Sequence, residues 1–170
     1  MFKKIAPLLF CCFTIAFHAY AQQQIKSATV NFVFVEKNVE GQFYGFTSNT
    51  NLDWENISDS VLKGAVETET IKTGNFLRDW SLKGEKYFDA DTYPKITFRS
   101  TGIKEDNNTF LVDGILTIKN IAKPIQFTFY KKDNHFLGKT TLFSSDFDIT
   151  ILKKGRDSNK VTIEIDLELE

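Results

Sequence analysis

The chain has 170 residues, with 21 basic and 22 acidic side chains and a net charge of −1 when both histidines are neutral. It therefore has no basic excess with which to bind the phosphates of a nucleic acid. Residues 22–170 are enough for one hydrophobic core, and no linker, repeat or low-complexity tract divides them.

The start of the chain has the features of a secretory signal peptide. Lys3 and Lys4 precede an apolar run over residues 5–17, and Ala19-Tyr20-Ala21 fits the small-x-small cleavage rule. The run is shorter than the roughly 20 residues that span a bilayer, so we expect no stable membrane anchor. We predict a signal peptide at 1–21, a mature domain at 22–170, and export, with the periplasm favoured over the extracellular space.

Removal of this leader would leave few residues for chemistry. Cys11, Cys12 and His18 would leave with it, so His135 would be the only histidine and no thiol would remain. A lipoprotein signal would have a small residue before its cysteine, whereas Phe10 stands before Cys11. Because a zinc site uses three or four histidine, cysteine or carboxylate ligands, we expect no metal site and no disulfide.

The mature chain alternates between apolar and polar residues, as half-buried strands do. The clearest example runs from Val161 to Leu169, where every second residue is apolar. Eight candidate strands lie near 28–36, 41–54, 60–72, 95–103, 109–119, 124–132, 135–148 and 160–169. Turn-forming residues at 106–108 and 154–159 separate some of them. Regular spacing of short strands is typical of an all-β sandwich or barrel.

The segment 74–89 breaks this alternation. Its Phe76, Leu77, Trp80 and Leu82 do not follow a period of two, and its composition favours one or two helical turns. We predict a short helical insert between strands 3 and 4 of a closed antiparallel barrel, lying at one mouth as a lid. A barrel of eight strands is wide enough to enclose one small ligand.

Phenylalanine is the unusual feature of the composition. Four of the 17 phenylalanines lie in the leader, so 13 remain in the mature chain. Most of them lie on the apolar sides of predicted strands, where aromatic residues are favoured. In one interpretation they fill the core of the barrel, and in the other they line a cavity for an elongated apolar ligand. Composition alone favours the filled core.

The motifs of the mature chain resemble those of the YceI-like family. The resemblance rests on Gly41-Gln42-Phe43 with Phe46, Thr68–Gly74, Arg78-Asp79, Tyr87-Phe88-Asp89, Tyr93–Phe98, Ser100-Thr101, Gly114–Ile118, Lys123-Pro124 and Ser145-Asp146-Phe147. These motifs span most of the mature chain in a specific order. Two places depart from the family pattern: no histidine occurs near Lys37 or Asn38, and Trp80-Ser81 stands where His-Leu often follows Arg78-Asp79.

The resemblance implies an all-β, eight-stranded, lipocalin-like antiparallel barrel that binds a long apolar molecule in its lumen. The ligand class is a polyisoprenoid, an isoprenoid quinone or a similar lipid, and no other cofactor is implied. The candidate ligand-binding residues are Phe32, Phe34, Phe43, Phe46, Phe76, Leu77, Arg78, Trp80, Phe88, Phe98, Leu116, Phe127 and Phe129. Of these, we expect Phe76, Leu77, Trp80 and Phe88 at the mouth. The missing histidines imply a different head group or contact with the apolar tail alone.

The pair Arg78-Asp79 allows two interpretations. A guanidinium group suits phosphate and carbonyl oxygens, so Arg78 is a candidate for binding a head group at the mouth of the barrel. Alternatively, one or both side chains tie the helical insert to the barrel by hydrogen bonds. The sequence favours this structural interpretation.

No set of residues predicts catalysis. Nucleophilic catalysis needs a base beside the nucleophile, and His135, the one histidine available, lies in a polar turn. The carboxylate pairs Asp146/Asp148 and Asp89/Asp91 lack an evident partner set for acid–base work. We expect an exported, non-catalytic monomer or homodimer that sequesters or carries an apolar lipid. The alternatives are a stress-related adaptor or structural protein with a filled barrel and no stable ligand, and an enzyme acting on a lipid or quinone.

Overall fold

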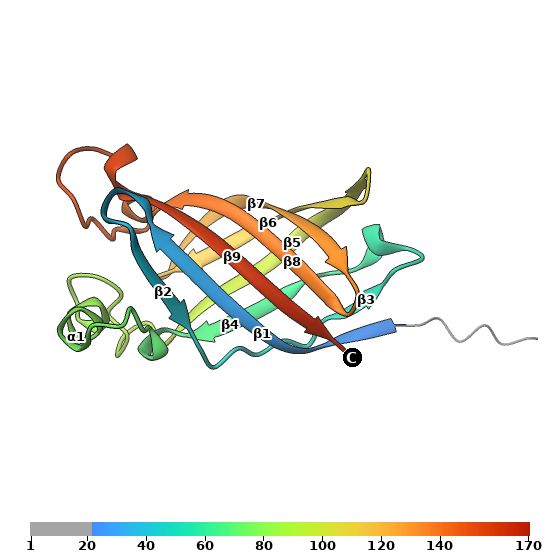
Figure 1. Ribbon diagram of the computed structural model, residues 1–170, viewed down its shortest axis with the longest axis horizontal. Coiled ribbons are helices and arrows are strands. Elements are labelled where there is room, and N and C mark those ends of the chain that lie inside the picture. Colours follow the sequence, from blue (N-terminus) through green and yellow to red (C-terminus); the bar gives the residue numbers. More distant parts are fainter. Residues whose placement is uncertain (1–21) are drawn as a thin grey trace, which may run out of the picture.

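The computed structural model describes residues 22–170 (Figure 1). The strands are β1 (Gln22–Phe34), β2 (Val39–Phe43), β3 (Asn51–Asp53), β4 (Lys63–Glu67), β5 (Lys95–Asp106), β6 (Thr109–Ile118), β7 (Ile121–Lys132), β8 (His135–Phe143) and β9 (Lys160–Leu169). The helix α1 spans Phe76–Lys83. Short 3-10 helices are η1 (Val35–Lys37), η2 (Ile57–Asp59), η3 (Thr68–Thr70), η4 (Ser144–Phe147) and η5 (Asp157–Asn159). The predicted signal peptide lies outside the described residues and stays a prediction.

Eight of these strands form the wall of a barrel, in the order β2-β1-β9-β8-β7-β6-β5-β4 with antiparallel neighbours. The two outer strands of this order meet along a seam that two short bridges hold, Gln42 with Lys72 and Thr47 with Ala65. The helix α1 follows β4 and precedes β5, which are the third and fourth wall strands in sequence order. The predicted eight-stranded antiparallel barrel with a helical insert is therefore confirmed.

Alternating side chains explain why these segments are strands. On β6 the residues Phe110, Val112, Leu116 and Ile118 are buried on the inward side, as a period of two requires. The hairpin turns also follow from local chemistry. Asn107 and Asn108 have φ values of 46° and 65°, and a two-residue hairpin turn of this kind needs positive φ at both positions. The turn predicted at 106–108 is confirmed.

The strand expected at 41–54 is divided into two. Gly45 has a φ of +66°, a backbone conformation that glycine adopts at no steric cost, and beyond it the chain keeps one bridge to the wall at Thr47 before it turns away. It forms the short strand β3, which pairs with Gln22–Gln24 at the start of β1. The strand expected at 135–148 is also shorter, because β8 ends at Phe143 and η4 follows.

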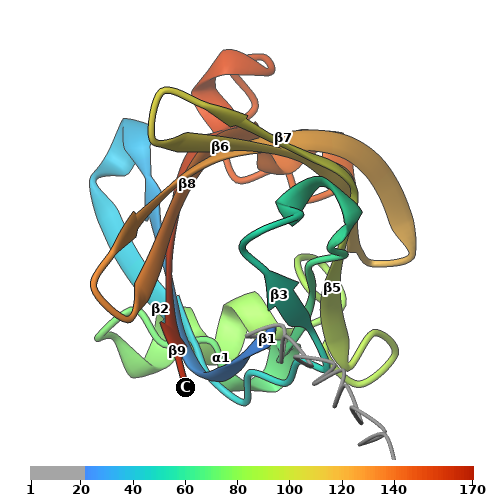
Figure 2. The same cartoon turned by 90° about the vertical axis from the view of Figure 1, so that its right-hand side faces the viewer.

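The two halves of the barrel are packed differently. At the end opposite α1, β3 and η2 lie inside the ring of strands (Figure 2), where Leu52 and Ile57 pack into a dense aromatic core. In this core the Phe136 ring stacks on Phe129 at 4.4 Å and meets Trp54 edge-on at 5.3 Å. A second apolar cluster, which includes Phe43, Ile71 and Phe147, belongs to the half nearer α1. We call these the packed half and the α1 half.

Candidate ligand-binding cavity

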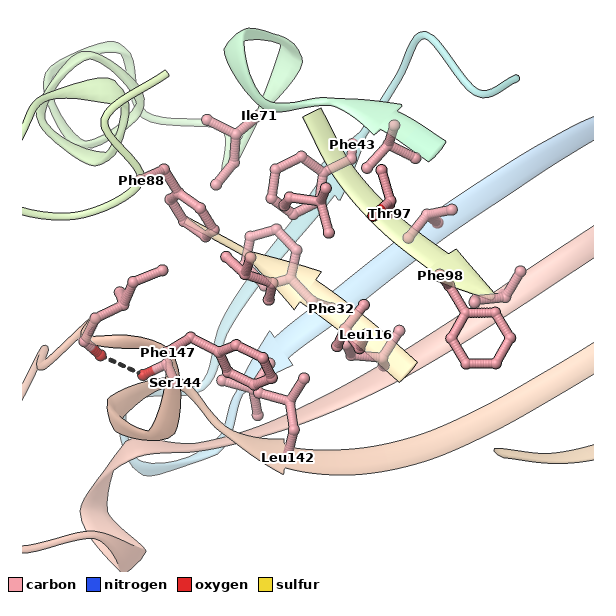
Figure 3. A pocket seen from close by; sticks show the side chains of 18 of the residues that line it. Phe32, Phe43, Ile71, Phe88, Thr97, Phe98, Leu116, Leu142, Ser144 and Phe147 are labelled. Carbon is pink, nitrogen blue, oxygen red and sulfur yellow. Dashed lines mark hydrogen bonds between the residues drawn. The ribbon is translucent and has the colours of Figure 1, made fainter. Parts of the chain in front are cut away.

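The α1 half of the barrel encloses a cavity of about 590 Å³, within the range of roughly 300–1,000 Å³ that is typical of small-molecule sites. Its wall consists of the inward faces of the strands, and its rim includes residues of α1 and of the segments around η3 and η4. Figure 3 shows Phe32, Phe43, Leu116 and Leu142 turned toward this space. The lumen is therefore neither filled throughout nor hollow throughout.

The structure brings together ten of the thirteen candidate ligand-binding residues. These ten line the cavity: Phe32, Phe34, Phe43, Phe46, Arg78, Phe88, Phe98, Leu116, Phe127 and Phe129. Phe127 and Phe129 also belong to the packed core and form the floor of the cavity. At the α1 end, Phe88 meets the ring of Phe43 edge-on at 5.5 Å. The alternating pattern of the strands was sufficient to place most of these side chains inside.

The other three candidates lie elsewhere than expected. Phe76, Leu77 and Trp80 do not line the cavity, and they are 78%, 73% and 72% exposed. The helix turns a different side toward the barrel, on which Arg78 and Leu82 border the cavity. Positions 76, 77 and 80 fall on the opposite side because a helix rotates by about 100° per residue. These three side chains therefore lie outside the cavity.

Several lining residues were not among the candidates. Val161, Ile163 and Ile165 line the cavity from β9, and the strict alternation of that strand already indicated an inward apolar face. Ile71 and Phe147 line it from segments without regular alternation. Only the tertiary fold identifies residues of this second kind, since no local pattern distinguishes them.

Several phenylalanine rings lie over glycines of the wall, and two of these pairs stand directly opposite each other on neighbouring strands. Phe32 on β1 faces Gly41 on β2, and Phe129 on β7 faces Gly138 on β8. A β-carbon at Gly41 would lie 2.2 Å from Cζ of Phe32, and one at Gly138 would lie 2.3 Å from Cε1 of Phe129. Each ring therefore covers the neighbouring strand where only glycine leaves room, an arrangement known to stabilise glycine-containing strands.

The charged side chains of the cavity are all basic. Lys37, Lys63 and Arg78 line it, and no aspartate or glutamate among residues 22–170 does so. Lys37 and Arg78 come from η1 and α1, which lie at the same end of the barrel (Figure 1). An apolar cavity with cations at its rim suits a molecule with an apolar body and an oxygen-rich polar end.

Arg78 and Asp79 both form hydrogen bonds with Thr73, which lies just before the helix. Arg78 donates from Nε to Thr73 Oγ1 and from Nη2 to the Thr73 carbonyl, each at 2.7 Å. The buried Asp79 carboxylate accepts the Thr73 backbone N–H at 2.7 Å. Asn75 caps the helix by accepting the Arg78 N–H at 3.0 Å. These bonds support the structural interpretation of Arg78-Asp79, while Arg78 also borders the cavity.

The remaining polar candidates do not form a reactive set. His135 begins β8 rather than lying free in a turn, and its Nδ1 lies 2.7 Å from Asp166. Asp146 accepts two hydrogen bonds from Arg156, and Asp148 lies 3.8 Å from the Lys119 ammonium group. Residues 22–170 contain no group of three or more histidine, cysteine, aspartate or glutamate side chains placed to hold a metal ion.

The barrel, its apolar cavity and the short helix at one end define a lipocalin-like barrel. The sequence matches the YceI-like domain over residues 20–169, so the chain belongs to the YceI-like family. This match confirms the resemblance seen in the sequence motifs. Within residues 22–170, no helix combines the length and the apolar character that a membrane crossing requires.

Curated relatives share part of the sequence. UPF0312 proteins of Photorhabdus laumondii and Yersinia pestis are 27% identical over 85 residues and 25% identical over 108 residues. These alignments cover 50% and 64% of this chain and 44% and 53% of the relatives. The chain thus matches about half the length of these relatives.

Solved structures share the fold. BcnA of Burkholderia cenocepacia has a TM-score of 0.74 at 22% identity, covering 84% of this chain and 96% of that one. The YCEI protein of Campylobacter jejuni has a TM-score of 0.66 at 24% identity, with 78% and 85% covered. A polyisoprenoid binding domain of Saccharophagus degradans, implicated in plant cell wall breakdown, has a TM-score of 0.58 at 11% identity, with 88% and 97% covered.

Proposed function

We propose that this protein is an exported, non-catalytic carrier that sequesters a long apolar lipid in the cavity of its barrel and acts in the periplasm. The ligand is a polyisoprenoid, an isoprenoid quinone or a similar lipid. The observation that carries the proposal is the cavity of about 590 Å³ with an almost entirely apolar lining. The polyisoprenoid binding domain of Saccharophagus degradans, which has the same fold, supports this class of ligand.

Burial of an apolar tail accounts for retention of such a ligand. Each buried methylene contributes about 0.8 kcal/mol, so one isoprene unit of five carbons contributes up to about 4 kcal/mol before the costs of binding are deducted. A few units inside the cavity would give strong retention without any charged contact. Phe32 and Phe43, whose ring centroids lie 5.5 Å apart, would pack against the tail.

The basic rim favours a polar end that presents oxygen atoms. Arg78 uses Nε and Nη2 to hold Thr73, and its guanidinium group has further N–H groups to donate. Lys37 lies at the same end of the cavity. A phosphate or carbonyl head group at this rim would accept hydrogen bonds from both residues while the tail lies deeper in the barrel.

The alternative is an adaptor or structural protein that holds no stable ligand. The packed half, in which Phe129 and Phe136 are almost completely buried, favours it, because that half leaves no room for a guest. The cavity in the α1 half favours the carrier. The two functions therefore differ in whether this cavity is occupied by lipid when the protein is isolated from its host.

Extraction with organic solvent and mass spectrometry of protein purified without detergent tests the proposal. We expect one dominant apolar lipid at close to one molecule per chain. Ile163→Trp would fill the cavity from β9, whereas Thr162→Trp adds the same side chain to the outward side of the same strand. Lipid lost in Ile163→Trp and kept in Thr162→Trp supports the carrier. A native protein without lipid, with a normal melting temperature, would overturn it.

A further inference from the structure

The side of α1 that faces away from the barrel is apolar and uncovered. Phe76, Leu77 and Trp80 are the three most exposed of the large hydrophobic residues among residues 22–170. They occupy an arc of about 100° on the helix, since each residue turns the helix by about that angle. We call these three residues the outer face of α1. A contiguous exposed apolar face of this kind marks a contact with something outside the molecule.

This face lies at the end of the barrel where the cavity lining includes α1 and Lys37 of η1. The same helix contributes Arg78, Ser81 and Leu82 to the cavity lining, so its two sides serve the interior and the exterior. In Figure 1 α1 stands at one end of the barrel, away from β3 and the C-terminus. Whatever covers the outer face of α1 therefore lies next to this end of the cavity.

The charges of the two ends differ in a way that orients the molecule. The connections at the far end, 44–62, 107–108 and 133–134, contain Asp53, Glu55, Asp59 and Asp133 and no lysine or arginine, and Lys131 and Lys132 stand at the adjoining end of β7. The connections at the α1 end, 35–38, 68–94, 119–120 and 144–159, contain nine basic and nine acidic residues. An anionic membrane surface would repel the far end and accept the balanced α1 end.

The outer face of α1 is small for a protein interface. Large aromatic side chains bury about 150–250 Å² each, so Phe76, Leu77 and Trp80 together offer about 500 Å². A stable protein interface buries roughly 800 Å² per partner. A second copy of the chain would thus find too little apolar surface on α1. A bilayer needs no complementary shape, and Trp, Phe and Leu are the residues that interfacial helices insert.

We propose that α1 docks the protein on a lipid bilayer, with Phe76, Leu77 and Trp80 inserted at the interface and the end of the cavity facing the lipid. This inference rests on the proposed carrier function and adds the place where the ligand is exchanged. The protein binds the membrane peripherally and reversibly, since three side chains supply the apolar contact. Lys72, Lys83 and Lys86 flank the outer face of α1 in the sequence, as do Glu69 and Glu85.

Tryptophan fluorescence provides a direct test with the full-length protein. The two tryptophans are Trp54, packed between Phe110 and Phe136, and the exposed Trp80. Vesicles of phosphatidylethanolamine with phosphatidylglycerol, and vesicles of phosphatidylcholine alone, are prepared with brominated acyl chains. We expect the emission of Trp80 to shift to the blue and to be quenched with both kinds of vesicle, because the α1 end is balanced in charge. In Trp80→Ser the remaining Trp54 emission stays unquenched.

Variants of the outer face of α1 give the quantitative result. Trp80→Ser weakens sedimentation with the vesicles about tenfold, the effect of leaving one large side chain unburied, and replacing all three residues by serine abolishes it. Tyr130→Ser is the matched control, because Tyr130 is 49% exposed on β7 and far from α1. Undiminished binding of the triple variant would overturn the proposal, as would quenching of Trp54 or a dimer that forms through α1 in place of vesicle binding.

The lipid content of the same samples separates this inference from the carrier function. The triple variant leaves the cavity lining unchanged, so it keeps its lipid if the carrier function is correct. Native protein that carries lipid and ignores both kinds of vesicle refutes membrane docking alone. Native protein that docks through Trp80 and carries no lipid refutes the carrier function and leaves docking standing.

Discussion

The close approach of Phe129 to Gly138 leaves no room for a methyl group on β8. We predict that Gly138→Ala destabilises the protein by about 1–3 kcal/mol, the usual cost of overpacking a core, because the Phe129 ring is stacked on Phe136 and has little freedom to move. Gly102→Ala is the control, since nothing lies within 4 Å of its added carbon and its φ is not positive. Urea unfolding of both variants checks this, and equal stability of the two would contradict it.

Arg78 serves the helix and the cavity with different nitrogen atoms. Arg78→Leu removes both bonds to Thr73, and we predict a loss of about 1 kcal/mol, at the low end because water reaches the partly exposed site. Arg78→Lys keeps the positive charge with fewer donors and should retain more lipid than Arg78→Leu. Melting temperature and lipid content are measured together. An unchanged lipid content in Arg78→Leu would show that the head group makes no contact there.

The segment that contains η4 and η5 is fastened at two points of different chemistry. Asn159 is buried and binds the backbone of Leu152 and Gly155 through its amide. Asp146 binds Arg156 through two hydrogen bonds. The hydrogen bond from Arg156 is the main cause that lowers the pKa of Asp146 below its ordinary value of 3.8. Of these two attachments, only the pair of Asp146 and Arg156 therefore depends on pH.

We predict that acid loosens this segment before the barrel unfolds. Because the pKa of Asp146 is lower in the folded state, the pair stabilises the fold above the unfolded pKa of about 3.9, and this contribution is lost as pH falls through the folded pKa. Hydrogen exchange of residues 148–158, corrected for the intrinsic exchange rate at each pH, should rise in the native chain as the pH falls from 5 to 2.5, a range that extends about one unit or more on either side of the unfolded pKa. Asp146→Asn should raise exchange at pH 5 and remove the step.

Local patterns predicted most elements but not those that depend on partners far along the chain. The alternation of β9 and the turns near Asn107 are encoded by neighbouring residues, so they were predicted. The polar start of β1, Gln22–Gln24, has no such pattern and becomes a strand because β3 and the end of the chain pair with it. The break at Gly45 similarly depends on where β3 finds its partner.

At the scale of the whole molecule, the packed half contributes most to the stability of the fold, and the α1 half contains the cavity. We predict that Phe136→Ala, between Trp54, Phe110 and Phe129, costs about 3–5 kcal/mol. Phe32→Ala should cost clearly less, because Phe32 borders the cavity and already lacks neighbours on one side. The two substitutions delete the same atoms, so the difference in unfolding free energy measures the difference between the halves. Equal costs would mean that the cavity is closed in solution.

The composition alone could not distinguish a filled barrel from a hollow one, because this barrel is filled in its packed half and hollow in its α1 half. Phe98 and Phe127 stand at the border, with ring centroids 5.2 Å apart. Which phenylalanines pack together depends on β3 and η2 entering one end of the barrel, and that insertion follows from no local pattern. The outward position of Trp80 was accessible from helical periodicity, once Arg78 and Leu82 were assigned to the opposite side.

The seam between β2 and β4 gives the barrel one joint that is weaker than the others. Pairs of backbone hydrogen bonds join Gln42 with Lys72 and Thr47 with Ala65, and one further bond runs from Glu67 to Tyr44, whereas β5 and β6 pair along nearly their whole length. Side chains of Ser48, Thr50 and Thr70 add hydrogen bonds across the seam, and we expect thermal motion to part the wall here first. The barrel can then widen along this seam and admit a ligand that is wider than the opening at its end. The other strand pairs meanwhile keep the rest of the wall intact.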